Sequence, residues 1–164
     1  MLQNAVYWQL LPSNPARRVK SPKTKKPKMK FFNDDECKFL IQSLMDLTGS
    51  KLKYKVAILL DIFSGVRRGE LIGLEWSNVD FKNETIEINK STQYLPEKGI
   101  FDKDPKTESS NRIVPIPNYI TNVLLEYKDW YDEWRELYGD KWIDSNKLFV
   151  QSNGKPMHPD TLGK

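Results

Sequence analysis

The stretch that decides the fold runs Phe63-Ser64-Gly65-Val66-Arg67-Arg68-Gly69-Glu70-Leu71-Ile72-Gly73-Leu74, and it sets arginines beside a glycine turn. Residues 52 to 63 place apolar side chains at helical spacing, and Gly65 stands where a left-handed residue is expected to end that helix. A second, short helix is predicted to begin near Arg67, with leucines on its apolar side. Because a guanidinium is a rigid fork of donors that matches two phosphate oxygens, this junction predicts an anion site. Two surface arginines near a helix start would show the same spacing.

Around this junction the sequence predicts a helix-rich α+β domain. Asn33 followed by Glu36 is a capping pattern for a helix from about 34 to 47. A hairpin or three-stranded sheet is predicted within about 85 to 116, because polar and apolar residues alternate there. A long helix from 118 to 138, with Asn118 as its cap and Gly139 as its stop, comes next. A short strand at 148 to 150 then precedes an Asn-Gly turn.

The positive charge is concentrated at the N-terminal end of the chain. The net charge of +4 divides into +8 for residues 1 to 30, which hold no acidic residue, and −4 for the remainder. Four prolines between 12 and 27 oppose a continuous helix and favour an extended linker. Such a basic linker can follow a phosphate backbone, although a disordered solubilising tail has a similar composition. The predicted DNA-contacting residues of the linker are Arg17, Arg18, Lys20, Lys23, Lys25, Lys26, Lys28 and Lys30.

Several classes of protein are disfavoured by composition. The single cysteine, Cys37, excludes an internal disulfide, and the sequence holds no metal-binding cluster and no phosphate-binding glycine loop. No apolar run is long enough to cross a membrane, and no cleavage site follows the N-terminal apolar residues. The only histidine, His158, precedes Pro159 and is expected to begin a helix rather than to act as a catalyst. We therefore expect a cytoplasmic protein that needs no metal and no cofactor.

The junction resembles the first catalytic box of the tyrosine recombinases, the family of phage and conjugative-transposon integrases. In that family the box reads Thr/Ser-Gly-Leu-Arg-x-x-Glu-Leu-x-x-Leu-x-Trp-x-Asp-hydrophobic-Asp, and this chain departs from it mildly at Val66 and Asn78. The matching residues are Ser64, Gly65, Arg67, Glu70, Leu71, Leu74, Trp76, Val79 and Asp80. The resemblance implies that Arg67 is the first catalytic arginine and that Glu70 supports it. Arg68 falls at a variable position, where it contacts the DNA backbone or is simply exposed.

A second segment, residues 104 to 116, resembles the family's Thr-Lys-Thr-x-x-Ser-x-Arg-x-hydrophobic-Pro-hydrophobic hairpin, with Pro105 in place of the usual threonine. The resemblance implies that Lys106 is the general acid that protonates the departing 5′ oxygen of DNA. A lysine near other cations can have its pKa lowered toward that task. Without the resemblance, a lysine at a turn would be read as merely solvated.

The resemblance also divides the chain. Residues 1–11 resemble the end of the last helix of a core-binding domain, residues 12–30 the linker, and residues 31–164 the N-terminal part of a catalytic domain. The family's His-x-x-Arg box, its later His or Trp and its tyrosine nucleophile have no match here. The tyrosines of the predicted long helix, Tyr119, Tyr127, Tyr131 and Tyr138, form a stripe typical of a buried or partner-facing side. We therefore expect a fragment that is inactive alone.

As a full-length protein, such a recombinase would cut and rejoin double-stranded DNA at attachment sites through a 3′-phosphotyrosyl intermediate, assembled as a tetramer. Two alternatives stay open. The 164 residues could act only as a non-catalytic DNA-binding or assembly module. A relative of the type IB topoisomerases is the weaker alternative, because the segment from Trp76 to Phe81 favours the integrases.

Overall fold

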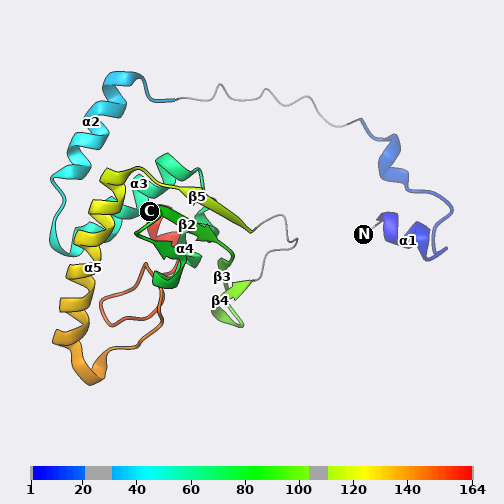
Figure 1. Cartoon of the computed structure of the whole chain (residues 1–164). Coiled ribbons are helices and arrows are strands. Elements are labelled where there is room, and N and C mark those ends of the chain that lie inside the picture. The colour runs from blue at the N-terminus through cyan, green and yellow to red at the C-terminus, as the bar shows by residue number, and fades with distance from the viewer. Residues whose placement is uncertain (1, 21–30, 104–110, 164) are drawn as a thin grey trace. The chain divides into compact units, whose positions relative to one another are not determined.

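The computed structural model describes residues 2–20, 31–103 and 111–163, and it divides the chain into two compact units, Met1–Cys37 and Lys38–Lys164 (Figure 1). The first unit contains the helix α1 (Leu2–Tyr7) and the 3-10 helix η1 (Pro15–Arg18). The side chain of Asn14 begins η1, since its Oδ1 accepts a hydrogen bond of 3.0 Å from the Ala16 backbone. The N-terminal helix is therefore shorter than residues 1–11, and it ends at Tyr7.

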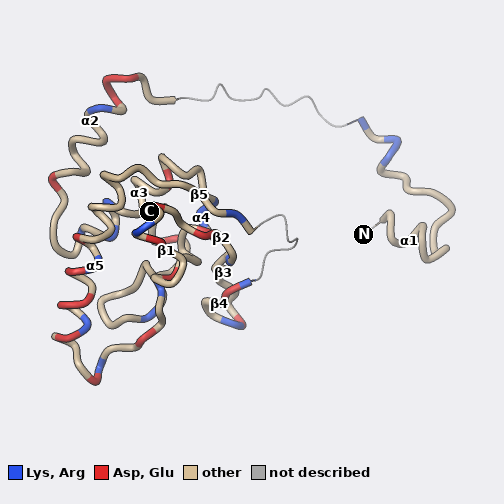
Figure 2. The backbone as a smooth tube through the Cα atoms, viewed as in Figure 1, with Lys and Arg blue, Asp and Glu red and all other residues tan. Residues whose placement is uncertain are grey.

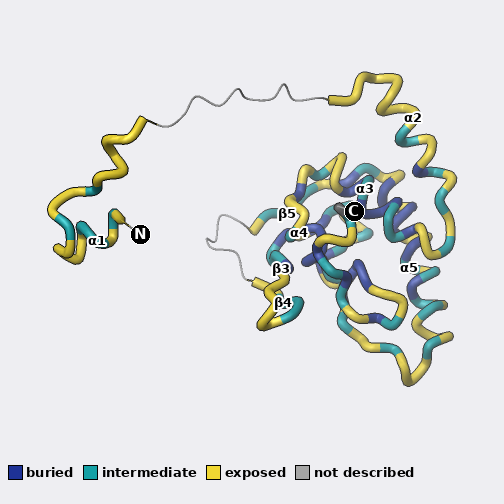
Figure 3. The backbone as a smooth tube through the Cα atoms, turned by 180° about the vertical axis from the view of Figure 1, so that it is seen from behind, coloured by how far each residue is buried: buried dark blue, intermediate teal, exposed yellow. Residues whose placement is uncertain are grey.

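The helix α2 (Asp34–Met45) begins with the capping arrangement that the sequence predicts. Glu36 accepts a hydrogen bond of 2.8 Å from the Asn33 backbone, and Asn33 accepts one of 2.9 Å from the Glu36 backbone. This reciprocal pair satisfies two N–H groups that the first turn of a helix leaves without partners. The helix is mostly exposed, and Leu44 is its buried residue (Figure 3).

The remaining elements build an α+β fold, as predicted. In chain order they are η2 (Gly49–Lys51), α3 (Leu52–Ser64), α4 (Arg68–Gly73), η3 (Trp76–Asn78), β1 (Val79–Asp80), β2 (Thr85–Ile88), β3 (Ser91–Leu95), β4 (Gly99–Lys103), β5 (Arg112–Pro115), α5 (Asn118–Tyr138), η5 (Gly139–Lys141) and η6 (Pro159–Gly163). Within the described part of the chain, no helix is both long and apolar enough to cross a membrane.

The core of the second unit lies between α3, α5 and the segment that precedes η6. α3 contributes Val56, Leu59 and Leu60, all fully buried, because these positions recur at helical spacing along one side. α5 faces them with a corresponding row, and Figure 3 shows both helices dark on their inner sides. The α5 residues in this row are Ile120, Val123, Leu124, Tyr127 and Tyr131. Of the tyrosines predicted as a stripe, Tyr127 and Tyr131 lie in the core, whereas Tyr119 is exposed and Tyr138 is half-buried.

The region predicted as a hairpin or three-stranded sheet contains a hairpin and two strands of a three-stranded sheet, whose third strand, β1, precedes the predicted region. Strands β1, β2 and β5 form an antiparallel sheet in that order, with Ile86 opposite Val114 and Ile88 opposite Arg112. Strands β3 and β4 form a separate two-stranded sheet, with Ser91 opposite Lys103. Because β5 pairs with β2, the β3–β4 hairpin stands as an insertion between two neighbouring strands, and Figure 1 shows it beside them.

Two local predictions were wrong. Residues 148 to 150 form no strand; isolated bridges at Lys147 and Val150 flank a bend instead. The reason is that their backbone groups have different partners, since Leu148 donates to Leu74 and Phe149 accepts from Met157. α5 is capped by Pro117 rather than by Asn118, whose side chain donates to Glu84 instead. Gly139 does end α5, as predicted.

Candidate functional site: the Arg67 junction

The junction between α3 and α4 is formed by a left-handed glycine. Gly65 has φ of 58° and ψ of 29°, and its N–H donates to the Asp61 carbonyl oxygen at 3.1 Å. Space does not require a glycine here, because a Cβ atom would meet nothing within 4 Å. The left-handed backbone conformation does require a glycine, since this conformation is strained for residues that carry a Cβ. Val66 is buried after the turn, and Arg67 then takes the cap position of α4.

The carboxylate of Glu70 holds Arg67 in two ways. Its Oε2 accepts a hydrogen bond of 3.1 Å from the Arg67 backbone, and its Oε1 accepts one of 2.9 Å from Nη1 of the Arg67 guanidinium. Only 10% of the Glu70 side chain is exposed, whereas 82% of the Arg67 side chain is. An exposed guanidinium is thus fixed at its base by a buried carboxylate.

A second arginine, Arg112, reaches the same carboxylate from β5. Its Nη2 donates to Glu70 Oε2 at 2.7 Å. Burial alone would raise the pKa of Glu70, but the hydrogen bonds from Arg112 and from the backbone and side chain of Arg67 lower it to about 2. Glu70 is therefore ionised at neutral pH. Two guanidinium groups around one carboxylate carry a net charge of +1, as an anion site requires.

Arg112 is a residue of this site to which the sequence assigned no role. Its place in the second segment that resembles the family was a signal of a role at the site. Its contact with Glu70 was not predictable from spacing, because the two residues lie 42 positions apart in the chain. Of the five N–H donors of a guanidinium, Arg67 gives one to Glu70. The other donors of this exposed side chain can reach two oxygens of a phosphate.

Arg68 points to a different partner. Its Nη1 lies 3.0 Å from Oδ1 of Asp160 in η6, and 58% of its side chain is exposed. It also lines a cavity of about 160 Å³ with Ala57, Leu71 and Leu162 among its other walls. His158 begins η6, as predicted, since its Nδ1 accepts a hydrogen bond of 3.1 Å from the Asp160 backbone.

The other predicted site residues are placed only in part. Arg17, Arg18 and Lys20 are exposed in the first unit, where Figure 2 shows them as a blue segment. Lys106 lies outside the described residues, as do Lys23, Lys25, Lys26, Lys28 and Lys30. Their roles stay predictions.

The tyrosines of the core are unsuited to nucleophilic attack. Tyr127 is fully buried and donates a hydrogen bond of 2.8 Å to the Leu148 carbonyl oxygen, and burial raises the pKa of its phenol. Burial likewise raises the pKa of Tyr131, which packs edge-on against Trp76 and Trp142.

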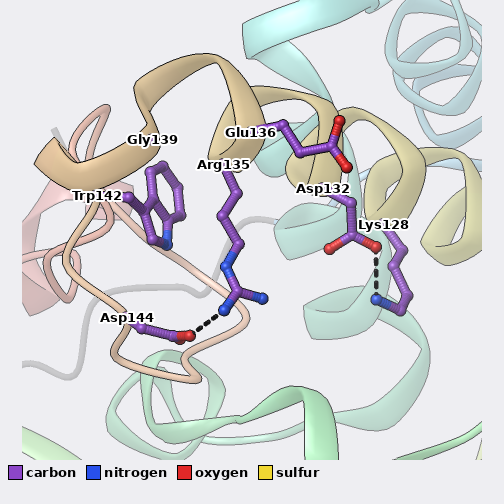
Figure 4. A pocket seen from close by; sticks show the side chains of 7 residues that line it. All are labelled: Lys128, Asp132, Arg135, Glu136, Gly139, Trp142 and Asp144. Atoms are coloured by element: carbon purple, nitrogen blue, oxygen red, sulfur yellow. Dashed lines mark hydrogen bonds and ion pairs between the residues drawn. The ribbon is translucent and has the colours of Figure 1, made fainter.

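A larger cavity, of about 690 Å³, lies at the C-terminal end of α5, and Figure 4 shows its charged walls. Lys128 pairs with Asp132 at 2.7 Å, and Arg135 pairs with Asp144. With Glu136 added, the lining holds three carboxylates and two cations, so its net charge opposes a phosphate. The structure describes no group of three or more His, Cys, Asp or Glu side chains that could hold a metal ion.

Comparison with known proteins points to one family. The family model described as "Phage integrase family" matches residues 30–164. A "Tyrosine recombinase XerC-like" of Caldanaerobacter subterraneus subsp. tengcongensis is 29% identical over 150 residues, which are 86% of this chain and 36% of that protein. The ICEBs1 integrase of Bacillus subtilis is 28% identical over 164 residues, which are 100% of this chain and 43% of that protein. The chain thus spans about two fifths of the length of these relatives.

Solved structures show the same fold. The Tn1549 transposon integrase in complex with transposon right end DNA has a TM-score of 0.73 at 20% identity, covering 94% of this chain and 50% of that one. The XerA recombinase has a TM-score of 0.59 at 23% identity, covering 87% of this chain and 42% of that one.

Proposed function

Because this chain belongs to the Phage integrase family, we propose that it supplies the Arg67 part of the catalytic domain of a site-specific tyrosine recombinase. Such an enzyme cuts and rejoins double-stranded DNA at attachment sites through a 3′-phosphotyrosyl intermediate. The observation that carries the proposal is the exposed Arg67 guanidinium held by the buried, ionised Glu70. It is supported by relatives named as an integrase and a tyrosine recombinase, and by the fold shared with a transposon integrase that was solved in complex with transposon DNA.

In this mechanism Arg67 binds nonbridging oxygens of the scissile phosphate. A tyrosine oxygen from outside these 164 residues attacks the phosphorus, and the bond from phosphorus to the 5′ oxygen breaks. Lys106 gives its proton to that oxygen, which leaves as a hydroxyl group. Negative charge grows on the nonbridging oxygens in the transition state, so a cation fixed in advance lowers the barrier. Glu70 and Arg112 fix that cation.

The proposal gives the remaining parts of the chain supporting roles. The basic linker, residues 12–30, would follow the DNA backbone, and Arg68 would contact it or remain exposed. The missing arginine, the nucleophile and assembly into a tetramer on DNA would come from the full-length protein, and the 164 residues alone would not cleave. A DNA substrate would place the activity in the cytoplasm.

The test is Arg67→Ala in the full-length protein, with single-turnover cleavage of attachment-site DNA at saturating protein. Loss of one fixed donor to the transition state costs about 10²- to 10³-fold in rate, so we expect cleavage to fall by at least that factor while most DNA binding remains. The matched control is Arg68→Ala, which removes the neighbouring charge and should leave the saturated cleavage rate within a few fold of wild type.

Cleavage by Arg67→Ala at the wild-type rate would refute the assignment of Arg67 to the scissile phosphate. An equal loss in both variants would point to a general disturbance of the α3–α4 junction rather than to a specific role of Arg67 in phosphate activation. A reading frame that stops at residue 164 in the natural gene would favour the alternative, a non-catalytic DNA-binding or assembly module.

A further inference from the structure

The strand β5 turns an arginine toward the inside of the fold and an isoleucine toward water. Successive side chains of a strand point to opposite faces, so Arg112 shares a face with the half-buried Val114, and Ile113 takes the other face. Ile113 is 70% exposed, whereas Ile88, which lies opposite Arg112 in β2, is buried. A charged side chain on an inner face is unfavourable unless an anion accompanies it there. Arg112 therefore needs a partner inside the fold.

That partner is the carboxylate that also holds Arg67. Arg112 Nη2 donates to Glu70 Oε2 at 2.7 Å, and Arg67 Nη1 donates to Glu70 Oε1 at 2.9 Å. The two guanidinium groups therefore flank a single carboxylate group. They bring two positive charges against one negative charge, so Glu70 neutralises only half of the charge that it draws together.

Both guanidinium groups can bind a second anion. A guanidinium has five N–H donors, and among the described residues Arg112 donates one hydrogen bond, to Glu70. The Arg112 side chain is 35% exposed, so a ligand can reach its guanidinium from solvent. Because Arg67 and Arg112 flank one carboxylate, a phosphate that binds to Arg67 comes close to Arg112 as well. Such a phosphate balances the remaining positive charge, and its oxygens match the planar fork of each guanidinium.

The helix α4, which joins the two arginines through Glu70, is itself held in place. A Cβ atom on Gly69 would lie 2.6 Å from Oγ of Ser91, so α4 lies directly against the start of β3. Lys147, whose side chain is 5% exposed, donates to the carbonyl oxygen of Gly73 at 3.1 Å and to Asp102 Oδ2 in β4 at 2.7 Å. Donors fixed in advance stabilise a transition state without reorganising at the moment of reaction. The site is thus built to hold its cations still.

We propose that Arg112 is a further catalytic residue of this site: its guanidinium binds a nonbridging oxygen of the phosphate that Arg67 binds, while Glu70 holds it in place. This inference rests on the proposed function, and it gives Arg112 a task at the reacting group beyond the support of Arg67. Negative charge grows on the nonbridging oxygens as the tyrosine oxygen adds to phosphorus. Arg112 is then a second fixed cation that this chain supplies to that charge.

A substrate without that charge isolates the role. In a methylphosphonate, a methyl group replaces one nonbridging oxygen of the scissile phosphate, so the reacting group carries no negative charge. A cation that stabilises the charge is then no longer needed, and its loss has little effect on the rate. A residue that acts only through the fold is needed as before, and its loss slows both substrates.

The experiment measures single-turnover cleavage of both substrates by the full-length protein at saturating concentration. Loss of one fixed donor costs about 10²- to 10³-fold, and Arg112 shares its donors with Glu70, so we expect Arg112→Gln to lose about 10- to 100-fold with the phosphate. With the methylphosphonate we expect a rate within a few fold of wild type. The matched control is Arg135→Gln, the same substitution in an arginine that pairs with Asp144, and it should cleave both substrates normally.

The double variant Arg67→Ala/Arg112→Gln separates a direct contact from an effect through Arg67. If Arg112 binds the phosphate, adding Arg112→Gln to Arg67→Ala lowers phosphate cleavage by about a further 10-fold, which extended time courses measure. The same addition leaves methylphosphonate cleavage within a few fold. If the double variant cleaves the phosphate as fast as Arg67→Ala alone, Arg112 acts only by holding Arg67, and the inference is overturned while the proposed function stands.

The remaining outcomes also decide. Slow cleavage of both substrates by Arg112→Gln would show a role in the fold alone and would overturn the inference, as would wild-type cleavage of both. If the methylphosphonate does not restore Arg67→Ala, the assignment of Arg67 to the scissile phosphate falls, and the inference falls with it. If Arg112→Gln does not fold, as circular dichroism would show, Arg112→Lys decides, because lysine keeps the charge beside Glu70 and loses the planar fork. Wild-type cleavage of the phosphate by Arg112→Lys would then overturn the inference.

Discussion

Replacing Glu70 by glutamine should destabilise the protein strongly at neutral pH and much less in acid. The pKa of Glu70 falls from 4.5 to about 2, and its side chain is only 10% exposed, whereas the side chain of its partner Arg67 is 82% exposed and is screened by water. Each tenfold change in acidity corresponds to about 1.4 kcal/mol, so ionised Glu70 contributes at most about 3 kcal/mol to the free energy of unfolding at pH 7. The amide keeps the shape of the side chain but cannot offer two charged acceptors to the arginines.

The sign of the pH dependence follows from the direction of the pKa. Because folding lowers the pKa, the stabilisation is complete above pH 4.5 and is lost as the pH falls toward about 2. Urea unfolding of wild type and Glu70→Gln at several pH values between 7 and 2.5 measures this directly. The difference between the two proteins should shrink steadily below pH 4.5.

The matched control is Glu87→Gln, the same substitution at an exposed position of β2. It should change the free energy of unfolding by no more than about 0.5 kcal/mol. A difference between wild type and Glu70→Gln that stays constant from pH 7 to 2.5 would refute the reasoning. Such a result would mean that the ionisation of Glu70 is not coupled to the two arginines.

Three further predictions test other parts of the structure. Arg112→Gln should destabilise the protein, and in a double-mutant cycle with Glu70→Gln the two effects should be non-additive by about 0.5 to 3 kcal/mol; additive effects would contradict the contact. Gly65→Ala should lower the free energy of unfolding by about 1 to 2 kcal/mol, and Gly65→Asn by less, because asparagine tolerates the left-handed conformation better. Deleting residues 17–30 should flatten the dependence of DNA affinity on salt, and an unchanged slope would show that the linker makes no phosphate contacts.

The parts of the fold that the sequence predicted well are those with local causes. Asn33 and Glu36 are three residues apart, and their reciprocal hydrogen bonds follow from that spacing. Gly65 ends α3 because the turn needs a left-handed residue, which is again a local requirement. The segment from 148 to 150 has the composition of a strand, but its backbone groups bond to two different segments, one at Leu74, far away in the chain, and one at Met157. Local pattern could not reveal that.

The same division holds within the site. The contact between Arg67 and Glu70 joins residues three apart at a helix start, so the sequence motif contained it. The contact between Glu70 and Arg112 spans 42 positions and depends on how β5 pairs with β2. The burial of Lys147 was harder still to predict from the sequence. A lysine in a polar stretch reads as solvated, and its burial became apparent only from the packing around it.

The contacts of Glu70 with Arg112 and of Lys147 with Asp102 both connect a strand to α4. Asp102 lies in the strand that leads into residues 104–110, and Arg112 opens the strand that leads out of them. Asp102 is tied through Lys147 to the end of α4, and Arg112 is tied through Glu70 to its beginning. Both β4 and β5 are therefore held by charged contacts against the helix that begins at Arg67. Charged contacts suit this task because hydrogen bonds between ions have one favourable geometry, whereas apolar contacts tolerate sliding.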